Sequence, residues 1–76
     1  MLLYKFDNYE IHSHDIDTRS NYNVGITIYK DGENIIGYHE KTGTKGINIL
    51  EGAIKSIRRF ERQSKAKTPE EFLAIS

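Results

Sequence analysis

The clearest pattern in the chain is a pair of alternating apolar and polar runs on either side of Asp31-Gly32. The runs are YNVGITIYK and ENIIGYHE, and both are rich in the β-branched and aromatic residues that favour strands. An Asp-Gly pair between two such runs is the strongest short-range signal for a β-hairpin. We therefore predict two antiparallel strands joined at this turn.

The length of the turn decides which side chains share a face of the hairpin. A two-residue loop pairs Lys30 with Glu33, whereas a three-residue loop with a left-handed glycine pairs Tyr29 with Glu33. We prefer the three-residue loop, because it gives one face that is almost entirely apolar. That face carries Tyr22, Val24, Ile26, Ile28, Ile36 and Tyr38, and the other carries Asn23, Thr27, Tyr29, Glu33 and His39.

Two further strand-like runs, LLYKF and YEIHSHDI, precede the hairpin and are interrupted at Asp7-Asn8. Unbroken alternation would place Phe6 on the same face as the histidines of the second run, which mixes a core with a polar surface. A bulge or a tight turn at Asp7-Asn8 resets the phase, so that Tyr9 and Ile11 follow the core. We predict that this region supplies one strand of a twisted, three-stranded antiparallel sheet over about residues 2–41.

A helical pattern follows KTGTKG, with apolar residues at spacings of three and four. It predicts a helix over about residues 48–64 that packs on the sheet, with Asn48 and Glu51 imitating a capping box. Gly52 indicates either the close approach of another backbone or a tolerated imperfection. The apolar stripe consists of Ile47, Leu50, Ala53, Ile54, Ile57 and Phe60.

The C-terminal segment TPEEFLAI has a threonine, then a proline at the first helical position and a glutamate at the third, which is typical of a helix start. We predict a short helical turn over about residues 69–75. A helix of this length is not stable alone, so we expect Phe72, Leu73 and Ile75 to dock on the domain or on a neighbouring chain.

The length of 76 residues suits one small domain, and we predict a single α+β domain over residues 1–76. The chain has no cysteine, which excludes disulfides and thiolate metal sites and fits a reducing environment. Its first residues lack the regions of a signal peptide, and no apolar run is long enough to span a bilayer. We therefore expect a cytoplasmic protein with no membrane partner.

Charge is segregated along the chain although the formal net charge is zero. Residues 1–40 hold three bases and seven acids, whereas residues 41–67 hold eight bases and two acids. The basic segment predicts a surface for anionic partners. The candidate binding residues are Lys41, Lys45, Lys55, Arg58, Arg59, Arg62 and Lys65.

These bases fall into two groups. Lys41 and Lys45 belong to the segment KTGTKG, which precedes the predicted helix. Backbone N–H groups at the N-terminus of a helix can bind an anion, so this segment is a candidate anion site. The alternative is that it is only a flexible connection between strand and helix. The bases from Lys55 onward form a stripe opposite or beside the apolar one. Arginine suits phosphate and carboxylate equally well, and a solvated charged face is the plain alternative.

The segment EIHSHDID is the main candidate for metal or catalytic chemistry. His12 and His14 point to one side of a strand, and His39 lies on the polar face in the preferred register. An open strand face desolvates such groups little, and the metallo-β-lactamase and calcium-loop motifs that the segment imitates are incomplete. We therefore predict no catalytic residue, no cofactor and no bound metal, with these three histidines as the weaker metal candidates.

The predicted order of three antiparallel strands and a helix resembles several small modules over about residues 2–65. These are the arm-type DNA-binding domains of phage integrases, HicB-type antitoxins and phage-encoded inhibitors of bacterial defence, and no residue motif selects among them. We expect a non-enzymatic binding or regulatory protein that presents its basic helix to nucleic acid or a nucleoprotein. The alternative is a protein–protein inhibitor or adaptor of the phage or mobile-element type, with a homodimer as one form.

Overall fold

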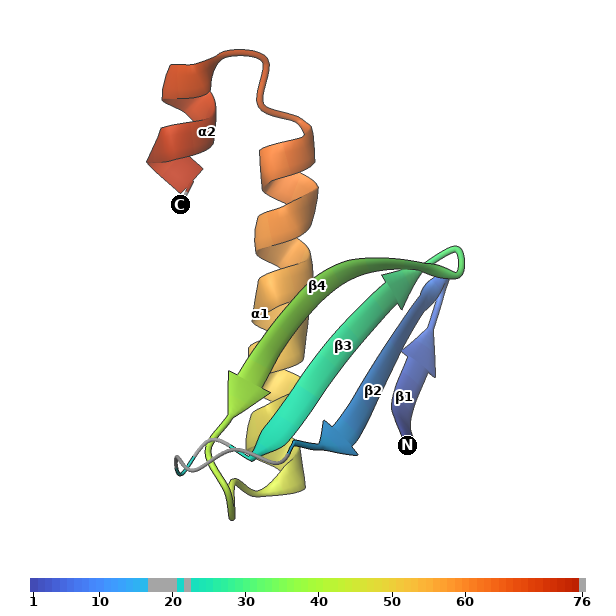
Figure 1. Cartoon of the computed structure of the whole chain (residues 1–76). Helices are drawn as coiled ribbons and strands as arrows, with labels where there is room; N and C mark the ends of the chain where they lie inside the picture. Colours follow the sequence, from blue (N-terminus) through green and yellow to red (C-terminus); the bar gives the residue numbers. More distant parts are fainter. Residues whose placement is uncertain (17–20, 22, 76) are drawn as a thin grey trace.

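The computed structural model describes residues 1–16, 21 and 23–75, which form a four-stranded antiparallel sheet with one long helix across one face (Figure 1). The strands lie side by side in their sequence order. The predicted α+β class, the antiparallel sheet, the main helix and the short C-terminal helix are confirmed, but the predicted number of three strands is wrong. The elements are β1 (Leu2–Phe6), β2 (Tyr9–Asp15), β3 (Val24–Lys30), β4 (Glu33–Glu40), α1 (Gly46–Ser64) and α2 (Pro69–Ile75).

The additional strand arises from a tight turn at Asp7-Asn8. Phe6 pairs with Tyr9 across this turn, and Asp7 has a positive φ of 50°. Asp and Asn tolerate such conformations because their short side chains hydrogen-bond locally. Of the two predicted ways to reset the phase, the turn is the one that occurs, and it reverses the chain so that β1 and β2 form a hairpin.

The hairpin of β3 and β4 has a two-residue turn, so the preferred three-residue loop is wrong. Lys30 pairs with Glu33, and Asp31 and Gly32 both have positive φ values, of 52° and 82°. Turns of this kind are favoured in hairpins because their twist matches that of the flanking strands. The Asp-Gly signal therefore located the turn correctly but not its length.

A bulge beside this turn restores the predicted apolar face. The register shifts between Ile28 and Tyr29, so that Ile28 pairs with Ile36 and Ile26 pairs with Tyr38. An extra residue on one strand changes which residues lie opposite each other and can restore the inward phase. Within the described residues, the apolar side chains that were predicted to share a face do share it, although their cross-strand partners differ from those predicted.

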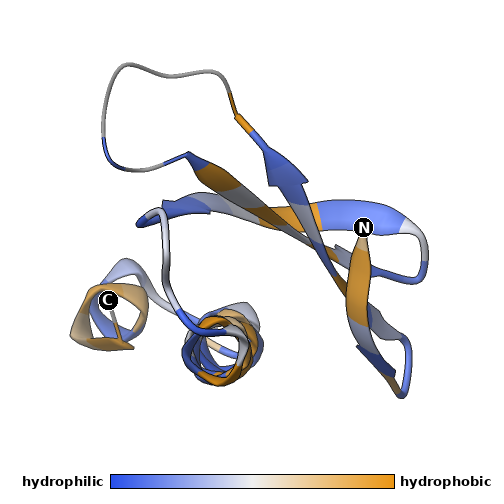
Figure 2. Cartoon of the chain, turned by 90° about the horizontal axis from the view of Figure 1, so that it is seen from below, coloured by the Kyte–Doolittle hydropathy of each residue, from blue (hydrophilic) through white to orange (hydrophobic). Residues whose placement is uncertain are grey.

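The core lies between α1 and the sheet face that it covers. Tyr9 and Ile11 are only 5% and 0% exposed, which confirms the predicted phase reset after Asp7-Asn8. Tyr22, which was predicted for the same face, lies outside the described residues. Figure 2 looks along α1 and shows the sheet on one side of this helix and α2 on another. The buried residues are Tyr9, Ile11, Ile26, Ile28, Ile49, Ala53 and Ile57.

Helix α1 begins at Gly46, two residues before the predicted start. Its N-cap is Lys45, and no described side chain forms a cap hydrogen bond there, so the predicted capping box does not form. Asn48 is already inside the first turn. The buried stripe is also rotated, because Ile49 is 8% exposed whereas Ile47, which was predicted to be buried, is 63% exposed.

Helix α2 begins as predicted, with Thr68 as its N-cap. The backbone N–H of Glu71 donates to the Thr68 hydroxyl at 3.2 Å, and the Glu71 carboxylate accepts from the Lys67 N–H at 2.8 Å. α2 lies beside the C-terminal part of α1 (Figure 1). The expected docking of its apolar side chains is only partial, since Phe72 and Leu73 remain 45% and 70% exposed.

The replacement of Gly52 by alanine is expected to stabilise the protein by up to about 1 kcal/mol, the difference in helix propensity between the two residues. A Cβ atom at Gly52 would lie 3.5 Å from the Glu40 carboxylate and 3.7 Å from the Tyr38 hydroxyl, which are ordinary contact distances. Urea unfolding followed by circular dichroism measures the change. A loss of stability would show that the contacts with β4 require glycine, and Gly46→Ala, which faces open space, is the control.

Candidate functional site

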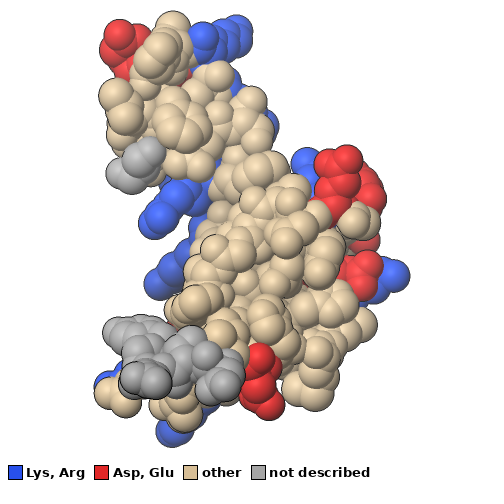
Figure 3. Space-filling view, in the orientation of Figure 1, with Lys and Arg blue, Asp and Glu red and all other residues tan. Residues whose placement is uncertain are grey.

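Four basic side chains lie on the exposed surface of α1 and a fifth lies at its C-cap, and we call this set the basic ridge. They lie on the helix face opposite buried Ala53 and Ile57 and span about 15 Å along the helix axis. Figure 3 shows Lys and Arg side chains along the left margin of α1 and several Asp and Glu side chains at the right, with further acidic side chains at the upper left and at the bottom. The basic ridge consists of Lys55, Arg58, Arg59, Arg62 and Lys65, all exposed.

The cations of the basic ridge have no ion pair with any described carboxylate. Glu51 and Glu61 precede Lys55 and Lys65 by four residues, a spacing that allows pairing on a helix. Within the described residues, however, the ion pair that forms is between His12 and Glu10, at 3.3 Å. The positive charges of the ridge are therefore available to an external anion.

One group of acidic side chains lies at an end of the sheet, away from the ridge, whereas Glu51 and Glu61 lie on α1 itself. The two tight turns of the sheet meet, because the Asp31 backbone N–H donates to the Asn8 carbonyl oxygen at 2.9 Å, and the Asn8 amide donates to the Asp31 carboxylate at 3.1 Å. Asp7, Asp31 and Glu33 therefore gather at one end of the sheet. The charge segregation along the sequence becomes a separation between this end and the exposed face of α1.

Lys41 and Lys45 form a separate group at the other end of α1. They line a shallow hollow of about 420 Å³ with Thr42, Gly43, Thr44 and Asn48. The loop is closed by the Thr44 hydroxyl, which donates to the Lys41 carbonyl oxygen at 2.7 Å, and by Gly43, whose φ is 88°. The predicted binding residues are thus divided between the two ends of the helix and do not form one cluster.

The candidate histidines lie on the sheet face opposite α1, as predicted. The His12 ring contacts the edge of Tyr29, with ring centroids 5.0 Å apart, and pairs with Glu10. His14 lies over Gly25, whose other cross-strand partner is His39. Within the described part of the chain, no three His, Asp or Glu side chains come together in a way that could hold a metal ion.

Helix α1 also borders a hollow on each of its flanks. Arg58 and Ile54 line one of about 250 Å³ beside Tyr4 and Phe6 of β1. Arg59 lines a larger groove of about 510 Å³ beside β4. The basic ridge therefore has two members that face different edges of the sheet.

Tyr38 of β4 contributes a buried hydroxyl to this groove. Burial raises the pKa of the Tyr38 hydroxyl and the negative charge of Glu40 adds to the rise, while nearby Ser56 opposes it. No described residue meets the geometry of a hydrogen bond to the buried hydroxyl. The nearby Ser56 hydroxyl donates to the Gly52 carbonyl oxygen at 2.9 Å. The neutral form of Tyr38 is therefore favoured in the fold.

The raised pKa of Tyr38 predicts an alkaline loss of stability. The folded protein holds this proton more tightly than the unfolded chain, so the contribution is complete below the ordinary tyrosine pKa of about 10 and is lost as pH rises through the folded value. Urea unfolding at neutral pH and above pH ~10 is expected to show a smaller loss for Tyr38→Phe than for the wild type. Tyr4→Phe is the control, since Tyr4 is 48% exposed. Equal losses in all three proteins would contradict this role.

Comparison of the chain with known protein families, with curated proteins and with solved structures found no match. The predicted likeness to small phage modules rests on three strands and a helix, a topology that the four-stranded sheet does not have. None of the helices in the described part of the chain is long and apolar enough to cross a membrane.

Proposed function

We propose that the protein is a non-enzymatic binding protein whose basic ridge contacts nucleic acid or a nucleoprotein. The proposal is supported by one observation above the others: five exposed cations share one helix face without an ion pair to any described carboxylate. Neutralising the phosphates of a nucleic acid with such cations releases condensed counterions, which favours binding. The proposed contacts are Lys55, Arg58, Arg59, Arg62 and Lys65, with Lys41 and Lys45 as a second group.

The charge layout also favours one orientation of the partner. A polyanion is attracted to the exposed face of α1 and repelled by the acidic end of the sheet. Lys45 and Lys55 are separated by about 15 Å along the helix, which corresponds to the rise of between four and five base pairs. Phosphate contacts alone position a protein without reading bases, so we expect binding with little sequence preference.

Titration of a fluorescent DNA duplex at several salt concentrations tests this function. If each of the five ridge cations neutralises one phosphate, the logarithm of the binding constant falls against the logarithm of salt with a slope of about −4.5. This slope corresponds to an affinity loss of about 500-fold between about 50 and 200 mM salt. Binding that is independent of salt, or no binding at the lower concentration, would contradict the proposal.

A protein–protein inhibitor or adaptor is the second candidate. It is supported by the exposure of Phe72 and Leu73 on α2, because neighbouring apolar side chains in water favour association. A homodimer is one form of this candidate. Light scattering at two protein concentrations separates a self-associating protein from one that needs a different partner.

A further inference from the structure

One edge of the sheet offers backbone hydrogen-bonding groups that no described strand uses. β4, with eight residues, is the last strand of the sheet and pairs with β3 on one side only. The other edge strand, β1, has five residues and carries a register shift between Leu2 and Tyr4. A long edge strand is a template to which an extended segment adds through main-chain hydrogen bonds. β4 is therefore the better template of the two.

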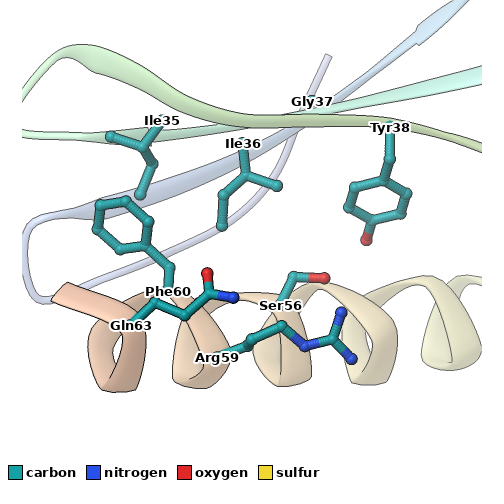
Figure 4. A pocket seen from close by; sticks show the side chains of 8 residues that line it. All are labelled: Ile35, Ile36, Gly37, Tyr38, Ser56, Arg59, Phe60 and Gln63. Atoms are coloured by element: carbon teal, nitrogen blue, oxygen red, sulfur yellow. The ribbon is translucent and has the colours of Figure 1, made fainter. Parts of the chain in front are cut away.

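Apolar side chains line the groove of about 510 Å³ beside this edge (Figure 4). Ile35, Ile36 and Tyr38 point from β4 towards α1, and Phe60 points from α1 towards β4. Ile35, Ile36 and Phe60 are all only partly buried. Apolar side chains of a ligand would remove this remaining surface from water, which is favourable.

Helix α1 provides a surface on which an additional strand can pack. It passes beneath β4 and continues beyond the edge of the sheet, where α2 lies beside it (Figure 1). A strand added to β4 would lie over the C-terminal half of α1, as the existing strands lie over its N-terminal half. The groove thus lies where one further strand of the same sheet would pass.

The positive charge beside the groove indicates which type of residue an added strand would carry. Arg59 lies at the edge of the groove next to Ser56 and Gln63. It is exposed and has no ion pair with a described carboxylate. Arginine pairs well with a carboxylate through two parallel hydrogen bonds. An acidic residue among the apolar ones would therefore complement the groove.

A second copy of this chain does not fit the edge in the symmetric way. Antiparallel pairing of β4 with its own copy needs a two-fold axis perpendicular to the sheet beside the strand. Gly37 and Tyr38 of β4 lie directly across the groove from Ser56 and Arg59 of α1. An axis centred at these residues would therefore pass close to α1 and superpose this helix on its own symmetry image. This disfavours a second copy paired symmetrically and favours an extended segment of another protein.

We propose that an extended segment of a protein partner adds to β4 as a fifth strand, placing apolar side chains in the groove and a carboxylate at Arg59. This inference shares Arg59 with the proposed nucleic-acid surface but otherwise uses the β4 edge of the molecule, and the ridge residues Lys55 and Arg62 take no part in it. It gives the second candidate function a binding site and a recognition chemistry.

Peptides selected from a display library of random short sequences against the full chain provide the probe. The proposal expects selected peptides to be apolar with an acidic residue and to protect β4 amides from hydrogen exchange. Arg59→Glu should weaken their binding about tenfold, and exchanging the peptide's acidic residue for lysine should restore binding to this variant. The matched control is Arg58→Glu, which makes the same change on the opposite flank of α1 and should leave affinity unchanged.

Methylation of alternate backbone nitrogens in a selected peptide tests strand addition itself. It leaves every side chain in place but removes hydrogen-bond donors, so binding should fall at least tenfold if the peptide pairs with β4. The proposal is overturned if no peptide is enriched, if the peptides protect other elements, or if Arg58→Glu and Arg59→Glu have equal effects. Competition by a DNA duplex for the same amides would also overturn it, because the groove would then belong to the nucleic-acid surface.

Discussion

The substitution Ile57→Ala is expected to destabilise the protein by about 3 kcal/mol, whereas Ile47→Ala should change stability by less than about 0.5 kcal/mol. Both residues belong to α1, so the gain in helix propensity on changing isoleucine to alanine is similar at the two positions. They differ in environment, since Ile57 is 2% exposed and packs on the sheet while Ile47 is 63% exposed. The difference between the two variants therefore reports the cavity and the lost burial.

Urea unfolding followed by circular dichroism measures both variants in one experiment. A domain of this size is typically stable by only about 4 to 11 kcal/mol, so Ile57→Ala is expected to remove between about a quarter and three quarters of the free energy of unfolding. Ile49→Ala offers a second test of the same face, because Ile49 is 8% exposed. If Ile47→Ala proved as costly as Ile57→Ala, α1 would have to pack on the sheet by a different face.

The triple substitution of Lys55, Arg58 and Arg62 by alanine is expected to flatten the salt dependence of nucleic-acid binding. Removal of three of the five ridge cations should change the slope from about −4.5 to about −1.8. The loss of affinity between about 50 and 200 mM salt would then fall from about 500-fold to about 12-fold. Arg59 is kept in this variant because it lines the groove beside β4. Duplex titration at several salt concentrations gives both slopes.

Two single variants distinguish the effect of where a positive charge lies from the effect of the net charge of the protein. Arg62→Ala and Lys5→Ala each remove one positive charge, but Lys5 lies on β1, opposite Glu10 of β2 and away from the ridge. The first should reduce the magnitude of the slope by about 0.9 and the second should leave it unchanged. Equal effects would mean that net charge, rather than the ridge, controls binding. Alanine favours the helix, so unfolding of α1 does not explain a loss of binding.

Local patterns predicted most of the elements, because strands and helices depend on residues close together in the sequence. The alternation around Asp31-Gly32 located a hairpin, the spacing of apolar residues located α1, and the residues from Thr68 located α2. The grouping of the ridge residues on one face of the helix could also be predicted, since helical periodicity alone places them together. These features need no knowledge of which elements pack together.

Strand number and register were harder to predict, because they depend on small differences between alternative backbone conformations. At Asp7-Asn8 a bulge and a turn reset the phase equally well, and only the turn adds a strand. At Asp31-Gly32 the apolar face was compatible with two loop lengths. The signal that separates them is the Ile35-Ile36 pair, since two adjacent apolar residues break the period of two and mark the bulge that the structure contains.

The groove beside β4 could not be predicted from the sequence, because it results from the angle at which α1 crosses the sheet. Nothing local to Tyr38 indicates that its hydroxyl is buried, and nothing local to Arg59 separates it from Arg58. Their different positions follow from the rotation of α1 that buries Ile49 in place of Ile47. The spacing of apolar residues along the sequence does not define the orientation of a helix about its own axis precisely enough to predict this rotation.

The order in which the strands and α1 follow one another has a consequence for how the chain folds during synthesis. Each strand pairs with its immediate neighbour in sequence, so the whole sheet can form its hydrogen bonds before α1 has been made. The apolar face with Ile11, Ile26 and Ile28 is then complete but uncovered. Only when α1 leaves the ribosome is this face protected. Nascent chains in which α1, beginning at Gly46, has not yet left the ribosome are therefore expected to be the form of the protein that is most prone to aggregate.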